Sequence, residues 1–152
     1  MLSQRPLAGE WQQVAKNELH TVSPLTPRFA LHRRSEVVEK LVGGYPQDCS
    51  NALWAMATIG ADARALVSGV EKKAVAEKLM RLGKPQEVSN ALWAMAKMKF
   101  DCSGFVGEFV CNADRILSCC KPQEASNIVH ALADLGYFDK SVFDAAARQA
   151  ER

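Results

Sequence analysis

One phrase occurs three times in this chain of 152 residues. The copies are PQDCSNALWAMATIG from Pro46, PQEVSNALWAMAKMKF from Pro85 and PQEASNIVHALADLGYF from Pro122. Successive copies therefore begin about 38 residues apart, a period within the range of helical repeat units. Self-similarity at such a period is typical of a solenoid, in which small units of secondary structure stack and bury a continuous core.

Each copy of the phrase has the pattern of a helix. Pro suits the first helical position, where an N–H has no partner within the helix. An acid follows two residues later, at Asp48, Glu87 and Glu124, where the positive end of the helix dipole favours it. Gly60 and Gly136 are the expected C-terminal stops of the first and third copies. In the second copy, apolar residues recur at the spacing of one buried helix face: Val88, Ala91, Leu92, Met95 and Ala96.

A second helix is predicted after each of these, so that every unit is a helical hairpin. The second helices are expected over residues 61–82, 104–120 and 140–152, and residues 26–42 have the pattern of one more second helix. The predicted fold class is therefore all-α, an alpha-solenoid of tandem helix-turn-helix repeats of about 38 residues. The predicted organisation is an N-terminal extension over 1–26 and a helical-repeat domain over 27–152, divided into a partial unit 27–45 and repeats 46–84, 85–121 and 122–152.

Composition and charge are compatible with a folded domain. Apolar residues make up 48% and charged residues 24%, and no run of 18 apolar residues predicts a membrane span. The net charge is +2, but residues 1–84 carry +4 and residues 85–152 carry −2. This asymmetry permits an RNA or another acidic partner near the N-terminal half without requiring one.

The cysteines and histidines predict neither a metal site nor catalysis. The five cysteines include no C-x-x-C pair, which favours small apolar residues in a reducing compartment over disulfides or zinc. Cys119 and Cys120 would point about 100° apart on a helix, which suits packing better than joint ligation of a metal. The three histidines are far apart in sequence, and no phosphate-binding, zinc-protease or nucleophile motif occurs. We therefore predict that the chain is not an enzyme and needs no cofactor.

The polar side of the first helix carries the candidate binding residues. In the second copy these are Gln86, Ser89, Asn90, Trp93 and Lys97. The first copy has Gln47, Ser50, Asn51, Trp54 and Thr58 at the same positions, and the third has Gln123, Ser126, Asn127, His130 and Asp134. Amides and hydroxyls can hydrogen-bond base edges or a 2′-OH, and a Trp or His ring can stack on a base.

Lysines precede two of the three helices. Lys84 and Lys121 lie beside helix N-termini, whose free N–H groups favour a phosphate. The complete set of predicted RNA-binding residues is Gln47, Asn51, Trp54, Thr58, Lys84, Gln86, Asn90, Trp93, Lys97, Lys121, Gln123, Asn127 and His130. Further candidates for phosphate contacts are Arg28, Arg33, Arg34, Lys72, Lys73 and Lys99.

Each of these residues also has a purely structural interpretation. The tryptophans can anchor neighbouring units, and the asparagines can form a hydrogen-bonded ladder between them. The serines can permit close approach of helices, the glutamines can cap them, and the lysines can be solvated loop residues.

The phrase PQ(D/E)xSNALWAMA, in units of about 38 residues, resembles the octotricopeptide repeat, a family related to the helical repeats of RAP-domain proteins. The resemblance covers roughly residues 27–152. It implies a superhelix of tandem hairpins that binds single-stranded RNA in mitochondria or chloroplasts, with roles in RNA stability, processing, splicing, translation and organellar ribosome structure.

We therefore expect a small subunit of a larger ribonucleoprotein, such as a mitochondrial or plastid ribosome. Its first helices would contact single-stranded RNA or rRNA, and neighbouring proteins would be its other partners. Two alternatives stay open: a protein–protein interaction scaffold that uses the same groove without RNA, and a piece of a longer repeat protein.

Overall fold

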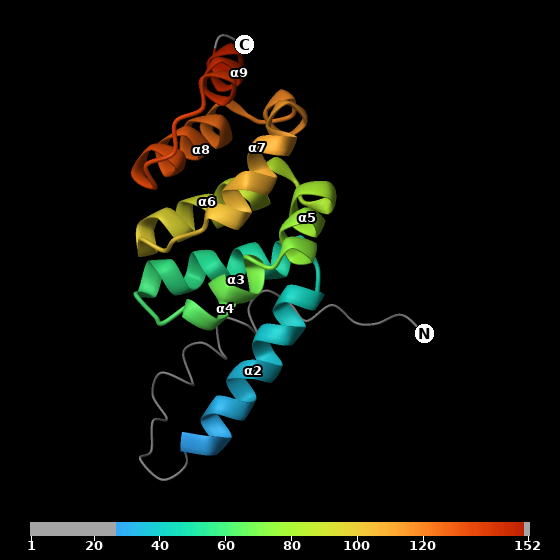
Figure 1. Cartoon of the computed structure of the whole chain (residues 1–152), viewed down its shortest axis with the longest axis vertical. Coiled ribbons are helices and arrows are strands. Elements are labelled where there is room, and N and C mark those ends of the chain that lie inside the picture. Colours follow the sequence, from blue (N-terminus) through green and yellow to red (C-terminus); the bar gives the residue numbers. More distant parts are fainter. Residues whose placement is uncertain (1–26, 151–152) are drawn as a thin grey trace.

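The computed structural model describes residues 27–150, with the side chains of residues 35–149. Within these residues every regular element is an α-helix (Figure 1). The helices are α2 Pro27–Gly43, α3 Pro46–Ile59, α4 Arg64–Val70, α5 Lys73–Leu82, α6 Pro85–Met98, α7 Ser103–Ser118, α8 Pro122–Asp134 and α9 Lys140–Ala150. The all-α prediction is confirmed, and none of these helices is long and apolar enough to cross a membrane. The predicted extension over 1–26 lies outside the described residues.

The helices form two rows (Figure 1). Helix α3 packs against α6, and α6 packs against α8, so the three copies of the repeated phrase lie side by side. We call these three helices the first-helix row. The second-helix row contains the remaining helices, of which α2 precedes α3 and α9 follows α8 in sequence. In this row α2 packs on α4, α5 on α7, and α7 on α9. The helices that carry the repeated phrase therefore also pack in a repeated way.

The apolar stripe of the repeated phrase lies in the core, as predicted. Val88, Ala91, Leu92 and Met95 are fully buried in α6, and Ala96 is almost so. Full burial of a Val, Leu or Met side chain contributes about 1.5–3 kcal/mol relative to leaving it exposed. Helix α6, which has a neighbour on each side in its row, therefore gains most of its stability from tertiary contacts.

Acids, and not the glutamines, cap α6 and α8. The carboxylate of Glu87 accepts a hydrogen bond from the backbone N–H of Lys84 at 2.9 Å, and Glu124 accepts one from Lys121 at 2.8 Å. Pro supplies the first residue of both helices, as predicted. The interpretation of Gln86 and Gln123 as caps is wrong. The glutamate one position later accepts the backbone N–H that has no partner within the helix.

The helices of the first row end in left-handed residues. Gly60 has φ 70° and Gly136 has φ 78°, which confirms both predicted stops. Helix α6 ends at Lys99 instead, with φ 55°. A side chain disfavours this conformation by roughly 1–2 kcal/mol, so the packing around α6 holds Lys99 in a conformation that glycine adopts more easily.

The single helix predicted over 61–82 is wrong, because the chain breaks between α4 and α5. Lys72 is extended, with φ −61° and ψ 128°. The preceding Glu71 turns its carboxylate to the N-terminus of α7, where it accepts the N–H groups of Gly104 at 3.1 Å and Phe105 at 3.0 Å. The break lets α4 lie against α2 while α5 lies against α7.

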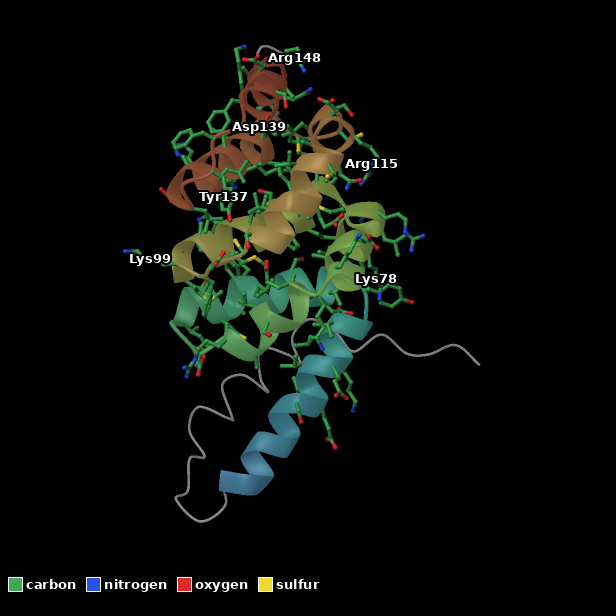
Figure 2. All side chains as sticks on the ribbon, viewed as in Figure 1. Lys78, Lys99, Arg115, Tyr137, Asp139 and Arg148 are labelled. Carbon is green, nitrogen blue, oxygen red and sulfur yellow. The ribbon has the colours of Figure 1, made fainter. Side chains whose placement is uncertain are left out.

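A basic residue joins α5 to α2, and another joins α7 to α5, in the second row. Lys78 of α5 donates to the carbonyls of Gly43 at 2.8 Å and Gly44 at 2.5 Å, at the end of α2. Arg115 of α7 donates in the same way to the carbonyl of Met80 in α5. Figure 2 shows Lys78 and Arg115 along the same side of the molecule. Cations at helix C-termini are favourable because the last carbonyls have no partner within the helix.

Candidate nucleic-acid interface

The predicted binding residues lie together on the outer side of the first-helix row. We call this surface the first-helix face. Its exposed members are Gln47, Asn51, Trp54, Thr58, Gln86, Lys97, Gln123 and His130, and its half-buried members are Asn90, Trp93 and Asn127. None of these eleven side chains is buried, and the helices α3, α6 and α8 that carry them lie side by side.

The two tryptophans differ in exposure although their sequence contexts are almost the same. Trp93 is half-buried and packs against the core, whereas 43% of Trp54 is exposed. Their ring centroids are 6.3 Å apart with planes inclined by 30°, within the range of a favourable aromatic pair. The Nζ of Lys97 lies 4.8 Å from the centroid of the Trp93 ring, which is a cation–π distance. Trp93 therefore joins two units, and Trp54 presents ring surface to solvent.

The polar members of the face are mostly available for contacts. Gln123 donates its amide to Asn127 at 3.0 Å, and the hydroxyl of Thr58 donates to the carbonyl of Trp54 at 2.8 Å. Between residues 35 and 149 no hydrogen bond joins the asparagines of neighbouring units, so the face gives no asparagine ladder. Their amide groups remain able to donate to and accept from a ligand.

Two of the serines predicted for this face lie inside the packing instead. Ser50 and Ser89 are buried, and Ser89 donates to the carbonyl of Glu124 in the next helix at 3.4 Å. Ser50 donates to the carbonyl of Gln47 at 3.2 Å. The prediction for these two residues is wrong because the neighbouring helix covers them, and they act as small residues at a close contact. Ser126 is exposed on α8.

Lys84 and Lys121 are exposed at the N-termini of α6 and α8. The carboxylates of Glu87 and Glu124 already accept the backbone N–H groups of these lysines. An incoming phosphate would therefore meet a carboxylate at each helix N-terminus. Each lysine offers its own ammonium group, but the backbone N–H groups beside it do not form a ready anion-binding site. Lys72, Lys73 and Lys99 are also exposed, while the side chains of Arg28, Arg33 and Arg34 lie outside those described.

A shallow recess of about 680 Å³ adjoins the face at Lys97, between the C-terminal ends of α6 and α8. Two cations and two aromatic rings contribute to its lining, which includes Lys97, Lys99, Phe100, Asp101, Asp134 and Tyr137. Figure 2 shows Lys99 and Tyr137 on the same side of the molecule. Sequence reasoning did not single out this recess, although Phe100 and Tyr137 are aromatic residues at equivalent positions of two successive repeats.

Sequence reasoning also missed an aspartate that orders the start of each second helix. Asp62, Asp101 and Asp139 accept the backbone N–H two residues later, at 3.1, 3.2 and 2.9 Å. The Ser141 hydroxyl and the backbone N–H of Val142 hold the pKa of Asp139 below its usual value. The signal was present, because these aspartates recur once in each repeat.

Three of the five cysteines behave as small apolar residues. Burial raises the pKa of the thiols of Cys49, Cys102 and Cys120 to about 12 in each case, so all three are neutral at physiological pH. Cys111 and Cys119 are exposed, and all five thiols are free. Among the described residues no group of three or more His, Cys, Asp or Glu side chains has the arrangement of a metal site.

No protein-family model matches the chain, and no curated protein matches its sequence. The resemblance to the octotricopeptide repeat therefore depends on the repeated phrase itself.

Proposed function

We propose that this protein is an RNA-binding alpha-solenoid of the octotricopeptide-repeat type, built from units of about 38 residues. Two observations support the proposal: the phrase that opens at Pro46, Pro85 and Pro122, and the side-by-side packing of the three helices that carry it. Stacked hairpins of this kind create extended binding surfaces, because equivalent side chains recur once in every unit.

The single observation that carries the RNA proposal is the composition of the first-helix face. Three neighbouring helices contribute amides at equivalent positions, with the exposed ring of Trp54 and the ammonium group of Lys97 among them. Amides can recognise base edges, an aromatic ring can stack on a base, and a cation can contact phosphate. A single RNA strand offers a partner for each of these three kinds of contact.

We further propose that the strand crosses α3, α6 and α8 and that one nucleotide enters the recess beside Lys97. The rings of Phe100 and Tyr137 suit a stacked base. The carboxylates of Asp101 and Asp134 in the same lining offset the charge of the two ammonium groups, so the recess suits the base rather than its phosphate. The proposed activity is binding without catalysis, and it requires no cofactor. By the family resemblance, the proposed setting is a ribonucleoprotein of a mitochondrion or chloroplast, such as an organellar ribosome.

A protein–protein interaction scaffold is the second candidate. The net charge of only +2 and the balance of −2 in residues 85–152 favour it, because RNA-binding domains usually carry a larger basic excess. Salt separates the two candidates. The logarithm of the RNA affinity should fall with the logarithm of salt concentration, with a slope of about −0.7 for each phosphate contact. A groove that binds an apolar helix should respond much less.

Crosslinking in the native cells, followed by sequencing of the attached RNA, tests the proposal directly. Trp54→Ala should weaken the binding of the enriched RNA by roughly 5- to 150-fold, the loss expected for one stacked base. Phe138→Ala is the matched control, because Phe138 is also an exposed aromatic residue but lies outside the first-helix face. Recovery of protein partners without any enriched RNA would refute the proposal and favour the scaffold.

A further inference from the structure

The recess between the C-terminal ends of α6 and α8 is lined by two aromatic rings that the helix ends hold in place. Lys99 and Gly136 are left-handed residues, and Phe100 and Tyr137 follow them directly. The N–H of Phe100 donates to the carbonyl five residues earlier at 3.2 Å, and the N–H of Tyr137 does the same at 2.8 Å. This is the Schellman arrangement of a helix end. Both rings are half-buried, so each keeps part of its surface open to a ligand.

The other junction of the first-helix row lacks such a pair of rings. Ala61 holds the position of Phe100 and Tyr137 in the first unit, and its N–H makes the same bond at 3.0 Å. Within the described row, two rings at this level therefore occur only at the junction of α6 with α8. Aromatic side chains are the platforms on which nucleobases stack.

Lys99 occupies a position at which the fold favours glycine. Its equivalents in the other two units are Gly60 and Gly136, and all three residues have positive φ. A side chain disfavours this conformation, so a lysine here lowers the stability of the end of α6. Backbone strain of this kind concentrates at ligand-binding sites. Lys99 is exposed and lines the recess, so its ammonium group can reach a ligand there.

The other charged groups of the recess differ in their availability. Asp101 uses one carboxylate oxygen to accept a backbone N–H at the start of α7 at 3.2 Å, and the Nζ of Lys97 lies over the ring of Trp93. Among the side chains that the structure describes, neither Asp134 nor Lys99 makes a hydrogen bond or ion pair. These two residues are therefore an acceptor and a donor that a ligand can engage without displacing an existing contact.

Guanine is the base whose edges match a carboxylate and an ammonium group together. Its N1–H and N2–H groups are adjacent donors that one carboxylate can accept, and its O6 and N7 atoms accept from a lysine. Uracil has a single N–H between two carbonyl oxygens, which a carboxylate repels. Adenine and cytosine have an unprotonated ring nitrogen beside the amino group. A carboxylate therefore finds two adjacent donors only on guanine.

From these observations we propose that the recess selects guanine. The base stacks on the rings of Phe100 and Tyr137. The carboxylate of Asp134 accepts the N1–H and N2–H groups, and the ammonium group of Lys99 donates to O6 or N7. Stacking alone tolerates every base, so Asp134 and Lys99 determine the specificity. This inference depends on the proposed RNA binding and adds which nucleotide the recess takes.

Fluorescence anisotropy of the full-length chain with labelled oligouridines of about ten nucleotides measures the preference. The probes carry a single central guanine, adenine, cytosine or inosine, and the strand of uridines alone is the reference. The guanine strand should bind about 5- to 150-fold more tightly than the reference, which is the discrimination expected for one bidentate contact. Adenine and cytosine should gain less. Inosine lacks the 2-amino group, so its strand should fall between those of guanine and uridine.

Two variants connect the preference to the assigned residues. Asp134→Asn should remove the difference between guanine and inosine, because its amide offers one acceptor oxygen instead of two. Asp114→Asn is the matched control, since it removes the same charge from an exposed site on α7 and should keep the preference. Lys99→Gly should reduce the preference for guanine without any loss of stability in urea denaturation, because glycine adopts the left-handed conformation more easily. Unfolding therefore cannot explain its effect.

The outcomes separate this inference from the RNA proposal on which it depends. Equal affinity for the guanine and uridine strands would overturn the guanine inference and leave RNA binding intact. A guanine preference that survives in Asp134→Asn as fully as in Asp114→Asn would also overturn it. If no strand bound even at low salt, the RNA proposal would fail and the guanine inference would fail with it.

Discussion

Replacement of Glu71 tests how strongly one unit orders the next. Its carboxylate accepts the N–H groups of Gly104 and Phe105 at 3.1 and 3.0 Å, across the boundary between two units. Hydrogen bonds to a charged group contribute about 1.5–3 kcal/mol each, and an anion at a helix N-terminus adds about 0.3–1 kcal/mol. Gly104 is exposed, so water can replace part of this interaction after substitution.

We therefore expect Glu71→Ala to lower the free energy of unfolding by about 2 kcal/mol, which is less than the roughly 3–6 kcal/mol of two such bonds because water replaces part of the interaction. Glu71→Gln keeps an oxygen acceptor but loses the charge, so its cost should be about half as large. Urea denaturation followed by circular dichroism at 222 nm gives these differences, and the corresponding fall in Tm for Glu71→Ala is roughly 6–8 °C.

Glu77→Ala is the matched control for this prediction. Glu77 pairs with Lys73 at 3.7 Å on the exposed surface of α5, four residues away on the same helix. Such pairs contribute about 0.3–0.5 kcal/mol. If Glu71→Ala destabilised the protein no more than Glu77→Ala, the hydrogen bonds to α7 would be energetically unimportant and the reasoning would be refuted.

Three further substitutions or treatments have expected outcomes. Lys99→Gly should stabilise the protein by about 1 kcal/mol in urea denaturation, because glycine adopts its left-handed conformation without strain; a loss of stability would contradict this. Asp139→Asn should lower Tm at pH 7. Because folding lowers the pKa of Asp139, its ionised form stabilises the fold above the unfolded pKa of about 4, and the difference between wild type and variant should vanish as acid titrates the folded carboxylate. Alkylation at pH 8, mapped by mass spectrometry, should modify the exposed Cys119 well before its buried neighbour Cys120, whose pKa is about 12; equal rates would show that the burial is transient.

Local sequence signals predicted most of the secondary structure because they act within one turn of helix. Pro85 begins α6, Gly60 and Gly136 end their helices, and the apolar stripe of α6 is buried. The break between α4 and α5 could not be predicted in this way. Residues 61–82 favour helix locally, and the contact of Glu71 with a helix of the next unit decides the outcome.

The candidate site also combines features that the local sequence predicts with features that depend on contacts between units. The repeated pattern predicted that polar and aromatic residues share one side of the first helices, and eleven of them are accessible there. It could not distinguish Trp54 from Trp93, because both occur in the sequence SNALWAMA. Their different exposure depends on their place in the row: α6 has a neighbour on each side, whereas among the described helices of that row α3 contacts only α6. Ser50 and Ser89 are buried because the next helix of the row covers each of them.

The packing of α6 against both α3 and α8 has a consequence for the order in which the molecule opens. In a linear array each element is stabilised by its neighbours, so the first helix that is packed on both sides within its row loses its hydrogen bonds last. Amide exchange should therefore be slowest in α6 and should accelerate through α3 and α8 toward both ends. A ligand that spans the row would then slow opening at the ends most, which makes exchange at those two helices a sensitive report of binding.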